Sequence, residues 1–391
     1  MLLAAILVSA CGGGNKLHFT REGVEPSPVP DVPRQEFPRS RLAPGPWRAH
    51  SDRARAGCVP PHDGDQVIVA GPGGEVAAIE LATGATRWEV DLDIPLTGGV
   101  GIGDGLALVG SLTGSVVALN RDDGAEVWRE SVGGEVLAPP AVAPGVAVVR
   151  AGDGRIVGLD TATGAVSWTV SKAIDGLTVR GMSKVLINGR GAVVGLADGR
   201  LVAIDIDRGR TLWETPIGTR RGASEVGRLA DIDADPELLG TVLYVASYQS
   251  RLVAMALGTP RVIWSADVST LKNFGIDADR LYVTSQRGTI VALNRFTGEV
   301  VWEQDQLSGR GLTGPLAVAG QLLVGDFEGN IFQLDLGQRR HSRLPAALGR
   351  RHRRTLRSRR RRHPRHVGKR ARPRPVAPLV QSASRGETPN P

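Results

Sequence analysis

The chain has only two cysteines, Cys11 and Cys58, and neither cysteine nor histidine stands between Asp63 and Gly337. Two cysteines cannot form the framework of a disulfide-rich domain. The missing residues also exclude Ser-His-Asp and Cys-His nucleophilic sites from this stretch, together with metal sites built on imidazole or thiolate ligands. Only carboxylates remain as candidates for chemistry there.

Segments with the 3.6-residue apolar period of a helix are also lacking between the repeats, which argues against repeat proteins with helical arms. Instead, one phrase recurs and ends each time in Trp, at steps of 38 to 51 residues. The copies are GEVAAIELATGATRW (74–88), GSVVALNRDDGAEVW (114–128), GRIVGLDTATGAVSW (154–168), GRLVAIDIDRGRTLW (199–213), SRLVAMALGTPRVIW (250–264), GTIVALNRFTGEVVW (288–302) and a truncated GNIFQLD from Gly329.

Each repeat predicts short strands joined by Gly-containing turns, as in one four-stranded propeller blade. In the third copy, Gly164 provides the positive φ of a turn, and Asp160 is placed to bind backbone amides just after it. The strands expected in this copy are drawn from LAPPAVA (137–143), GVAVVRA (145–151), RIVGLD (155–160) and AVSWTVS (165–171).

The apolar pattern indicates how blades pack. Runs such as VVAL, IVGL and LVAI do not alternate with polar residues, so both faces of the strand are expected to be buried. The recurring Trp is then a wedge between blades. The sequence therefore predicts an all-β fold, a β-propeller over residues 63–337, with the last blade or blades incomplete.

Charge divides the chain. Residues 338–391 hold eighteen Arg or Lys and one acid, a net charge of +17, whereas the whole chain carries +8, so residues 1–337 carry −9. We therefore expect a basic, disordered tail after an acidic propeller. Because the pattern is lost so suddenly, we hypothesise a change of reading frame, or another gene-level error, near codon 336. An alternative is a basic arm for nucleic acid or anionic lipid.

The beginning of the chain, MLLAAILVSAC, contains an apolar stretch that is too short to span a bilayer. LVSAC resembles the lipobox of bacterial lipoproteins, although no Lys or Arg precedes it, so the true start can lie upstream. The resemblance implies a signal peptide at 1–10, lipidation of Cys11 and a tether at 11–62. Trp47, 41 residues before Trp88, is a candidate for a strand that completes the last blade.

Two stretches between strands are candidate ligand sites. RLADIDADPE carries Asp231, Asp233 and Asp235 at alternate positions, and calcium takes oxygen ligands. The EF-hand pattern is absent, so a polar loop surface is the favoured interpretation. GGVGIGDG (98–105) has glycines spaced as in nucleotide-binding loops, but no helix follows it, which favours turns between strands.

The repeat core resembles that of PQQ-like propellers, and several segments between the repeats resemble the BamB family, lipoproteins of the outer-membrane Bam complex. That resemblance implies an eight-bladed, non-enzymatic scaffold without cofactor or metal, anchored by lipid at the periplasmic face of the outer membrane. The segments are LTVRG (177–181), SEVGRLADIDADP (224–236), VASYQSRLVAM (245–255), GLTGP (311–315) and LVGDFEGNI (323–331).

The resemblance also implies a partner, the POTRA domains of the barrel-forming subunit BamA, and a role in inserting β-barrel proteins. The family's contact loops match Leu177, Val179 and Arg180 in one segment and Asp231 and Asp233 in the next. Leu177 and Val179 suit an apolar anchor in an interface, and Arg180 suits charge-assisted hydrogen bonds from its forked guanidinium. A purely structural alternative pairs Arg180 with Asp231 to stiffen the loops.

Other functions stay open at this point. Quinoprotein oxidoreductases share the repeat, but they are longer and carry adjacent cysteines that the repeats here lack. A periplasmic propeller that binds a small ligand or cell-wall fragment is a third possibility. Strand addition at an exposed blade edge is another way to bind BamA or unfolded barrel proteins.

Overall fold

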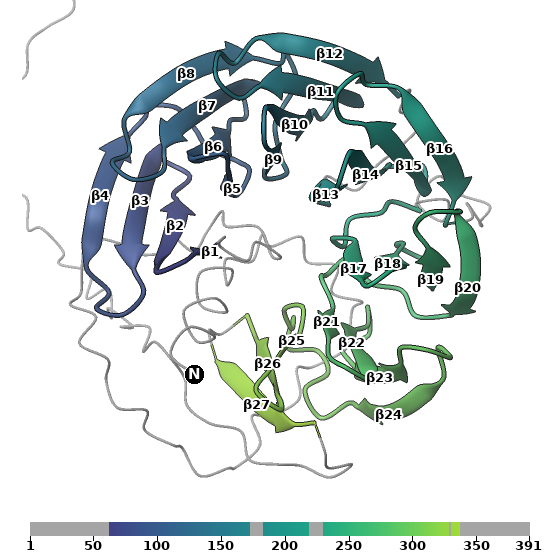
Figure 1. Ribbon diagram of the computed structural model, residues 1–391. Coiled ribbons are helices and arrows are strands. Elements are labelled where there is room, and N and C mark those ends of the chain that lie inside the picture. The colour runs from purple at the N-terminus through teal and green to yellow at the C-terminus, as the bar shows by residue number, and fades with distance from the viewer. Residues whose placement is uncertain (1–61, 173–182, 219–229, 328–329, 337–391) are drawn as a thin grey trace, which may run out of the picture. The chain divides into compact units, whose positions relative to one another are not determined.

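The computed structural model describes residues 62–172, 183–218, 230–327 and 330–336, and every regular element within them is a β-strand. The strands form seven antiparallel sheets, six of four strands and one of three, all within the unit Met1–Arg350. We number these sheets blades 1 to 7 in chain order. The all-β architecture expected from the repeats is confirmed, and Figure 1 shows the blades following one another around a common centre.

Within each blade the spatial order of the strands is their order in the chain, so hairpins join all neighbours. Blade 1 contains β1 (His62–Asp63), β2 (Gln66–Ala70), β3 (Glu75–Glu80) and β4 (Thr86–Asp91). Blade 2 contains β5 (Gly101–Gly103), β6 (Leu106–Gly110), β7 (Ser115–Asn120) and β8 (Glu126–Ser131). Blade 3 contains β9 (Ala141–Ala143), β10 (Val146–Arg150), β11 (Arg155–Asp160) and β12 (Val166–Ser171).

The remaining blades repeat this plan, and the seventh has three described strands. Blade 4 contains β13 (Leu186–Asn188), β14 (Gly191–Gly195), β15 (Arg200–Asp205) and β16 (Thr211–Pro216). Blade 5 contains β17 (Glu237–Leu239), β18 (Val242–Ala246), β19 (Leu252–Ala256) and β20 (Arg261–Ala266). Blade 6 contains β21 (Gly275–Ile276), β22 (Arg280–Thr284), β23 (Ile290–Asn294) and β24 (Val300–Gln304), and blade 7 contains β25 (Leu316–Val318), β26 (Gln321–Gly325) and β27 (Ile331–Asp335).

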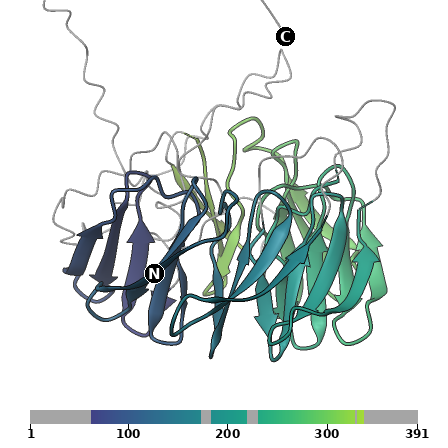
Figure 2. The same cartoon turned by 90° about the horizontal axis from the view of Figure 1, so that it is seen from above.

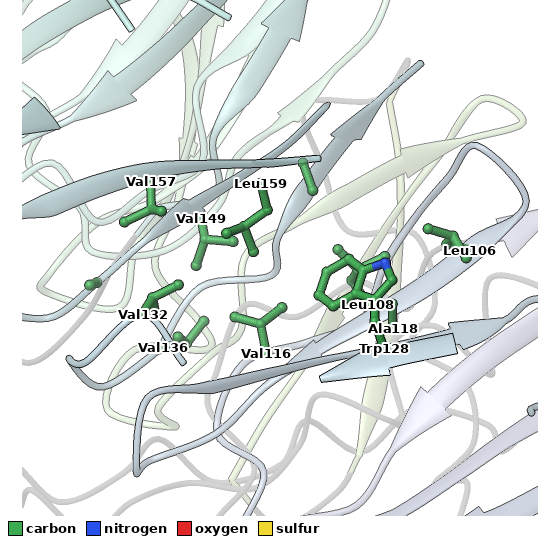
Figure 3. Close-up of a cluster of buried hydrophobic side chains, with 12 residues drawn as sticks. Leu106, Leu108, Val116, Ala118, Trp128, Val132, Val136, Val149, Val157 and Leu159 are labelled. Atoms are coloured by element: carbon green, nitrogen blue, oxygen red, sulfur yellow. The ribbon is translucent and has the colours of Figure 1, made fainter. Parts of the chain in front are cut away.

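The middle strands are buried on both faces, as their uninterrupted apolar runs predict. In β10, Ala147 and Val149 belong to the core shared with blade 2, whereas Val146 and Val148 belong to the core shared with blade 4. Successive side chains of a strand point to opposite faces, so one strand serves two interfaces. Figure 3 shows the first of these cores, where Leu108 and Val116 of blade 2 lie near Val149 and Val157 of blade 3.

The recurring Trp is confirmed as a wedge between blades. Trp128 is 8% exposed, and its Nε1 donates a hydrogen bond of 2.7 Å to the carbonyl oxygen of Thr161 in the next blade. Burying a Trp removes roughly 150–250 Å² from water, about 4–6 kcal/mol of gross transfer free energy as an upper bound. The same bond joins Trp88 to Arg121 at 2.9 Å, Trp168 to Ile206 at 2.6 Å and Trp264 to Arg295 at 2.9 Å.

The turn that receives each of these Trp rings has the expected chemistry. Asp160 Oδ1 accepts hydrogen bonds from the amides of Ala162 (3.1 Å) and Thr163 (2.8 Å), and Gly164 has φ +77°. A Cβ added to Gly164 would lie 2.7 Å from Cδ2 of Trp128. Glycine is therefore required at this position for two reasons, the positive φ of the backbone and the close approach of the Trp128 ring.

The junction between blades 4 and 5 departs from this pattern. Pro260 occupies the turn position that holds a positive-φ glycine in the neighbouring blade, where Gly298 has φ +77°. Trp213, which faces this turn in the repeat order, is only half-buried. Proline cannot adopt a positive φ, so this turn cannot receive a ring as Gly164 does.

Antiparallel pairing places the connections of each blade at two ends. The turn between the second and third strands lies at the same end of the blade as the loop that leads into the next blade, and we call this end the loop face. Figure 2 shows the blades from the side, with connections at both ends of the strands. Within the described residues, no helix has the length and apolar character needed to cross a membrane.

Candidate functional site

The segment Ala230–Asp235 lies on the loop face, in the connection from blade 4 to blade 5, and its residues alternate like those of a strand. Ala230, Ile232 and Ala234 are fully buried. The three aspartates that alternate with them belong to the opposite side of the extended segment. An apolar side thus fixes the segment to the blades beneath and leaves the acidic side for polar contacts.

Hydrogen bonds hold this segment to both blades. The amide of Ile232 donates to the carbonyl of Leu196 in blade 4 (3.3 Å), and the amide of Tyr248 in blade 5 donates to the carbonyl of Asp231 (2.9 Å). Ser183 Oγ donates to the carbonyl of Ile232 at 2.9 Å. The backbone of the segment is therefore tied on both sides before any partner binds.

Close packing at one glycine completes the attachment. A Cβ added to Gly195, the last residue of β14, would lie 2.5 Å from Cγ2 of Ile232. The same relation recurs between blades 2 and 3, where a Cβ on Gly110 would lie 2.2 Å from Cγ1 of Val136. The small strand-end residue makes room for the branched side chain of the loop, so the loop position is set by the blades.

The three aspartates have different surroundings. Asp231 is 1% exposed and Asp233 is half-buried. Asp235 accepts hydrogen bonds from the amide of Lys184 and from Asn273 Nδ2, both at 2.7 Å, and burial raises the pKa of its carboxyl despite these bonds and the charge of Lys184. The sequence favoured a polar loop surface, and for Asp231 this is wrong because neighbouring blades cover its side chain.

Only part of the predicted contact lies in the structure. Asp231 and Asp233 share the acidic side of one segment, as the sequence pattern requires. The other three predicted contact residues, Leu177, Val179 and Arg180, lie outside the described residues. Cys11, the tether at 11–62 except its last residue, and the basic tail at 338–391 also lie outside them.

Sequence reasoning missed a charged residue beneath this segment, Arg150 at the end of β10. Its side chain is 6% exposed, and Asp233, Asp231 and Asp198 exert an attraction on it. A register comparison of the repeats reveals it, because the strand-end residue is small in every other blade. Those residues are Ala70, Gly110, Gly195, Ala246, Thr284 and Gly325.

The chemistry of this region suits recognition. Among the residues that the structure describes, no group of three or more His, Cys, Asp or Glu side chains is placed to hold a metal ion. The alternating aspartates therefore do not form the oxygen cluster that the calcium interpretation needs. What the segment offers is a fixed backbone with half-buried Asp233 and Asp235 and buried Asp231 on its acidic side.

Comparison with known proteins shows the family to which the chain belongs. Residues 72–304 and 261–350 match the family model described as outer membrane protein assembly factor BamB. The BamB of Pseudomonas aeruginosa is 46% identical over 275 residues, which cover 70% of this chain and 72% of that protein. The BamB of Kangiella koreensis is 42% identical over 271 residues, covering 69% and 70% of the two chains.

Solved structures give the same result for the fold. The crystal structure of BamB from Moraxella catarrhalis superposes with a TM-score of 0.68 at 32% identity, covering 73% of this chain and 87% of that one. The quinohemoprotein alcohol dehydrogenase of Comamonas testosteroni superposes with a TM-score of 0.58 at 14% identity. At that identity the likeness shows the shared propeller architecture alone.

Proposed function

The chain belongs to the BamB family of outer membrane protein assembly factors, and we propose from this membership that it serves as a scaffold on which β-barrel proteins are inserted. As a member it is part of the Bam complex, associates with the outer membrane on the periplasmic side and is not an enzyme. The observation that carries the proposal is the family match, which extends from residue 72 to residue 350 and includes the acidic segment.

We further propose that the partner is BamA, through its POTRA domains, and that Leu177, Val179, Arg180, Asp231 and Asp233 form the contact. The fixed backbone at Ala230–Asp235 supports this, because a preformed surface loses little conformational entropy when it binds. Burial divides the roles of the acids. Half-buried Asp233 is able to reach a partner, whereas buried Asp231 supports the segment from within.

The membrane attachment proposed here is a lipid on Cys11. The support is the LVSAC sequence, which places small residues directly before the cysteine, as lipoprotein signal peptidases require in the family that it resembles. Residues 12–62 would then connect the anchor to the first blade and let the propeller reach a partner near the membrane.

Replacement of Leu177 or Arg180 by alanine tests the proposed contact. Each variant is expected to weaken binding of the isolated POTRA domains at least tenfold in titration calorimetry, because apolar anchors and Arg forks dominate interface energies. The melting temperature should stay within about 2 °C of that of the wild type. A matched control is Leu212→Ala, which truncates a 53% exposed side chain on the outer strand β16.

The outcome separates the candidate functions. Equal affinity of Leu177→Ala, Arg180→Ala and Leu212→Ala would refute the proposed contact residues. No binding by the wild-type chain would refute POTRA recognition itself and return attention to a ligand-binding propeller.

A further inference from the structure

Arg150 breaks the rule that the second strand of a blade ends in a small residue. It is the last residue of β10, and the corresponding residue in the other six described blades is glycine, alanine or threonine. Arg150 is only 6% exposed, so its long charged side chain is buried. A long cation therefore fills a position where the fold elsewhere needs almost no side chain.

The direction of its side chain follows from the alternation of β10. Val146 and Val148 pack into the core shared with blade 4, and Arg150 has the same parity. It is thus directed toward blade 4, at the end of the strand on the loop face. The acidic segment Ala230–Asp235 begins on that same blade, bound to Leu196.

The charge on Arg150 is not neutralised by a direct contact at its Nη1 atom, which is buried and has no hydrogen-bond partner among the described residues. Burial lowers the pKa of this guanidinium, and the negative charges of Asp233, Asp231 and Asp198 oppose the shift. The attractions of Asp233 and Asp231 on Arg150 are each larger than that of Asp198.

A buried cation with an unused donor is costly to the fold, because its lost hydration is not replaced. An aliphatic side chain of similar length would fill the same space without this cost, so the charge suggests a role beyond packing. Arg150 is too buried to touch a partner. Its positive charge does attract Asp231 and Asp233, the two aspartates assigned to the partner contact.

We propose that Arg150 is a positioning residue for the partner-binding face: its buried charge holds the Asp231–Asp233 segment in the orientation that a partner recognises. This inference rests on the proposed function, because the segment is the proposed contact. It also deepens that function by assigning part of the binding affinity to a residue outside the interface.

Arg150→Met and Arg150→Lys test the proposal in the full-length protein, with Arg155→Met as the control on the neighbouring strand, where Arg155 pairs with Asp153 at 2.6 Å. Methionine keeps the length and removes the charge, and lysine keeps the charge. We expect Arg150→Met to weaken POTRA binding about tenfold while the melting temperature stays the same or rises. Arg150→Lys and Arg155→Met should bind within about threefold of the wild type.

Hydrogen exchange gives a readout that needs no partner. The amides of Ile232 and Tyr248, which tie the acidic segment to blades 4 and 5, should exchange at least fivefold faster in Arg150→Met than in the wild type. If the wild-type protein does not bind the POTRA domains, the proposed function is wrong. The exchange rates of these amides would still show whether Arg150 positions the segment. Unchanged exchange in Arg150→Met, or equal losses of binding and melting temperature in both Arg150 variants, would overturn the positioning role.

Discussion

At the scale of single residues, the loop face contains charged side chains that the fold partly buries. Lys272, in the loop that leads into blade 6, is one of them, and burial lowers its pKa from 10.5 to about 8. Its neighbours Thr270 and Phe274 are almost completely buried. Lys272 is therefore expected to cost stability whenever its amine is protonated.

This cost should depend on pH in a defined direction. Below about pH 8 the Lys272 amine is protonated in both the folded and the unfolded state, so burying its charge destabilises the folded state to the full extent. Between about pH 8 and 10.5 the unfolded state binds a proton that the folded state does not, and stability rises with pH. We predict that Lys272→Met stabilises the protein by about 1–3 kcal/mol at pH 7, and that this gain shrinks as the pH approaches 9.5.

Urea denaturation of both proteins at pH 7, 8 and 9.5 measures the difference. Lys172→Met is a suitable control and should bring no gain, because Lys172 Nζ lies 2.7 Å from Glu214 Oε2. A gain for Lys272→Met that is the same at all three pH values would contradict a charge-burial origin.

At the scale of elements, the unit of stability is the contact between the Trp of one blade and the turn of the next. Trp128 and the turn at Asp160–Gly164 belong to different blades, and they are joined by a hydrogen bond and by close packing. Four blade junctions share this geometry. The fold is thus held together by repeated neighbour contacts.

We predict that Gly164→Ala destabilises the protein by about 2–4 kcal/mol, because a Cβ would both disfavour φ +77° and lie 2.7 Å from the Trp128 ring. Gly145→Ala is the matched control. Gly145 has φ +81° in the same blade, but no atom lies within 4 Å of its added Cβ, so it should cost only about 1–2 kcal/mol. Equal losses in urea denaturation would mean that the ring contact adds nothing.

The repeats made this level predictable from the sequence. Strands, turns and the wedge role of Trp follow from local rules that each copy obeys, so Gly164 and Asp160 could be assigned before the structure was known. The Trp213 junction could not be assigned in this way, because the ring's surroundings depend on Pro260 in the next blade. The burial of Asp231 and the attraction between Arg150 and the acidic segment also arise from contacts between blades, which one repeat does not specify.

At the scale of the whole molecule, the blades provide a stable frame, and the loop face carries the features that differ between repeats. The third strands of blades 2 to 5 each contain four consecutive buried residues. Arg150 and the alternating aspartates are departures from that repetition, and they meet near one junction, between blades 3, 4 and 5. In the proposed function, this region recognises another subunit.

The most direct test of this account is an insertion assay in proteoliposomes that contain a Bam complex from which its own BamB subunit has been omitted. The rate at which an unfolded β-barrel protein becomes heat-resistant and folded is measured with and without the full-length chain. We expect the chain to bind the complex and raise the insertion rate, and we expect Arg150→Met to raise it less than Arg155→Met does. Stoichiometric binding with no change in rate, or a rate unaffected at any concentration of the chain, would contradict it.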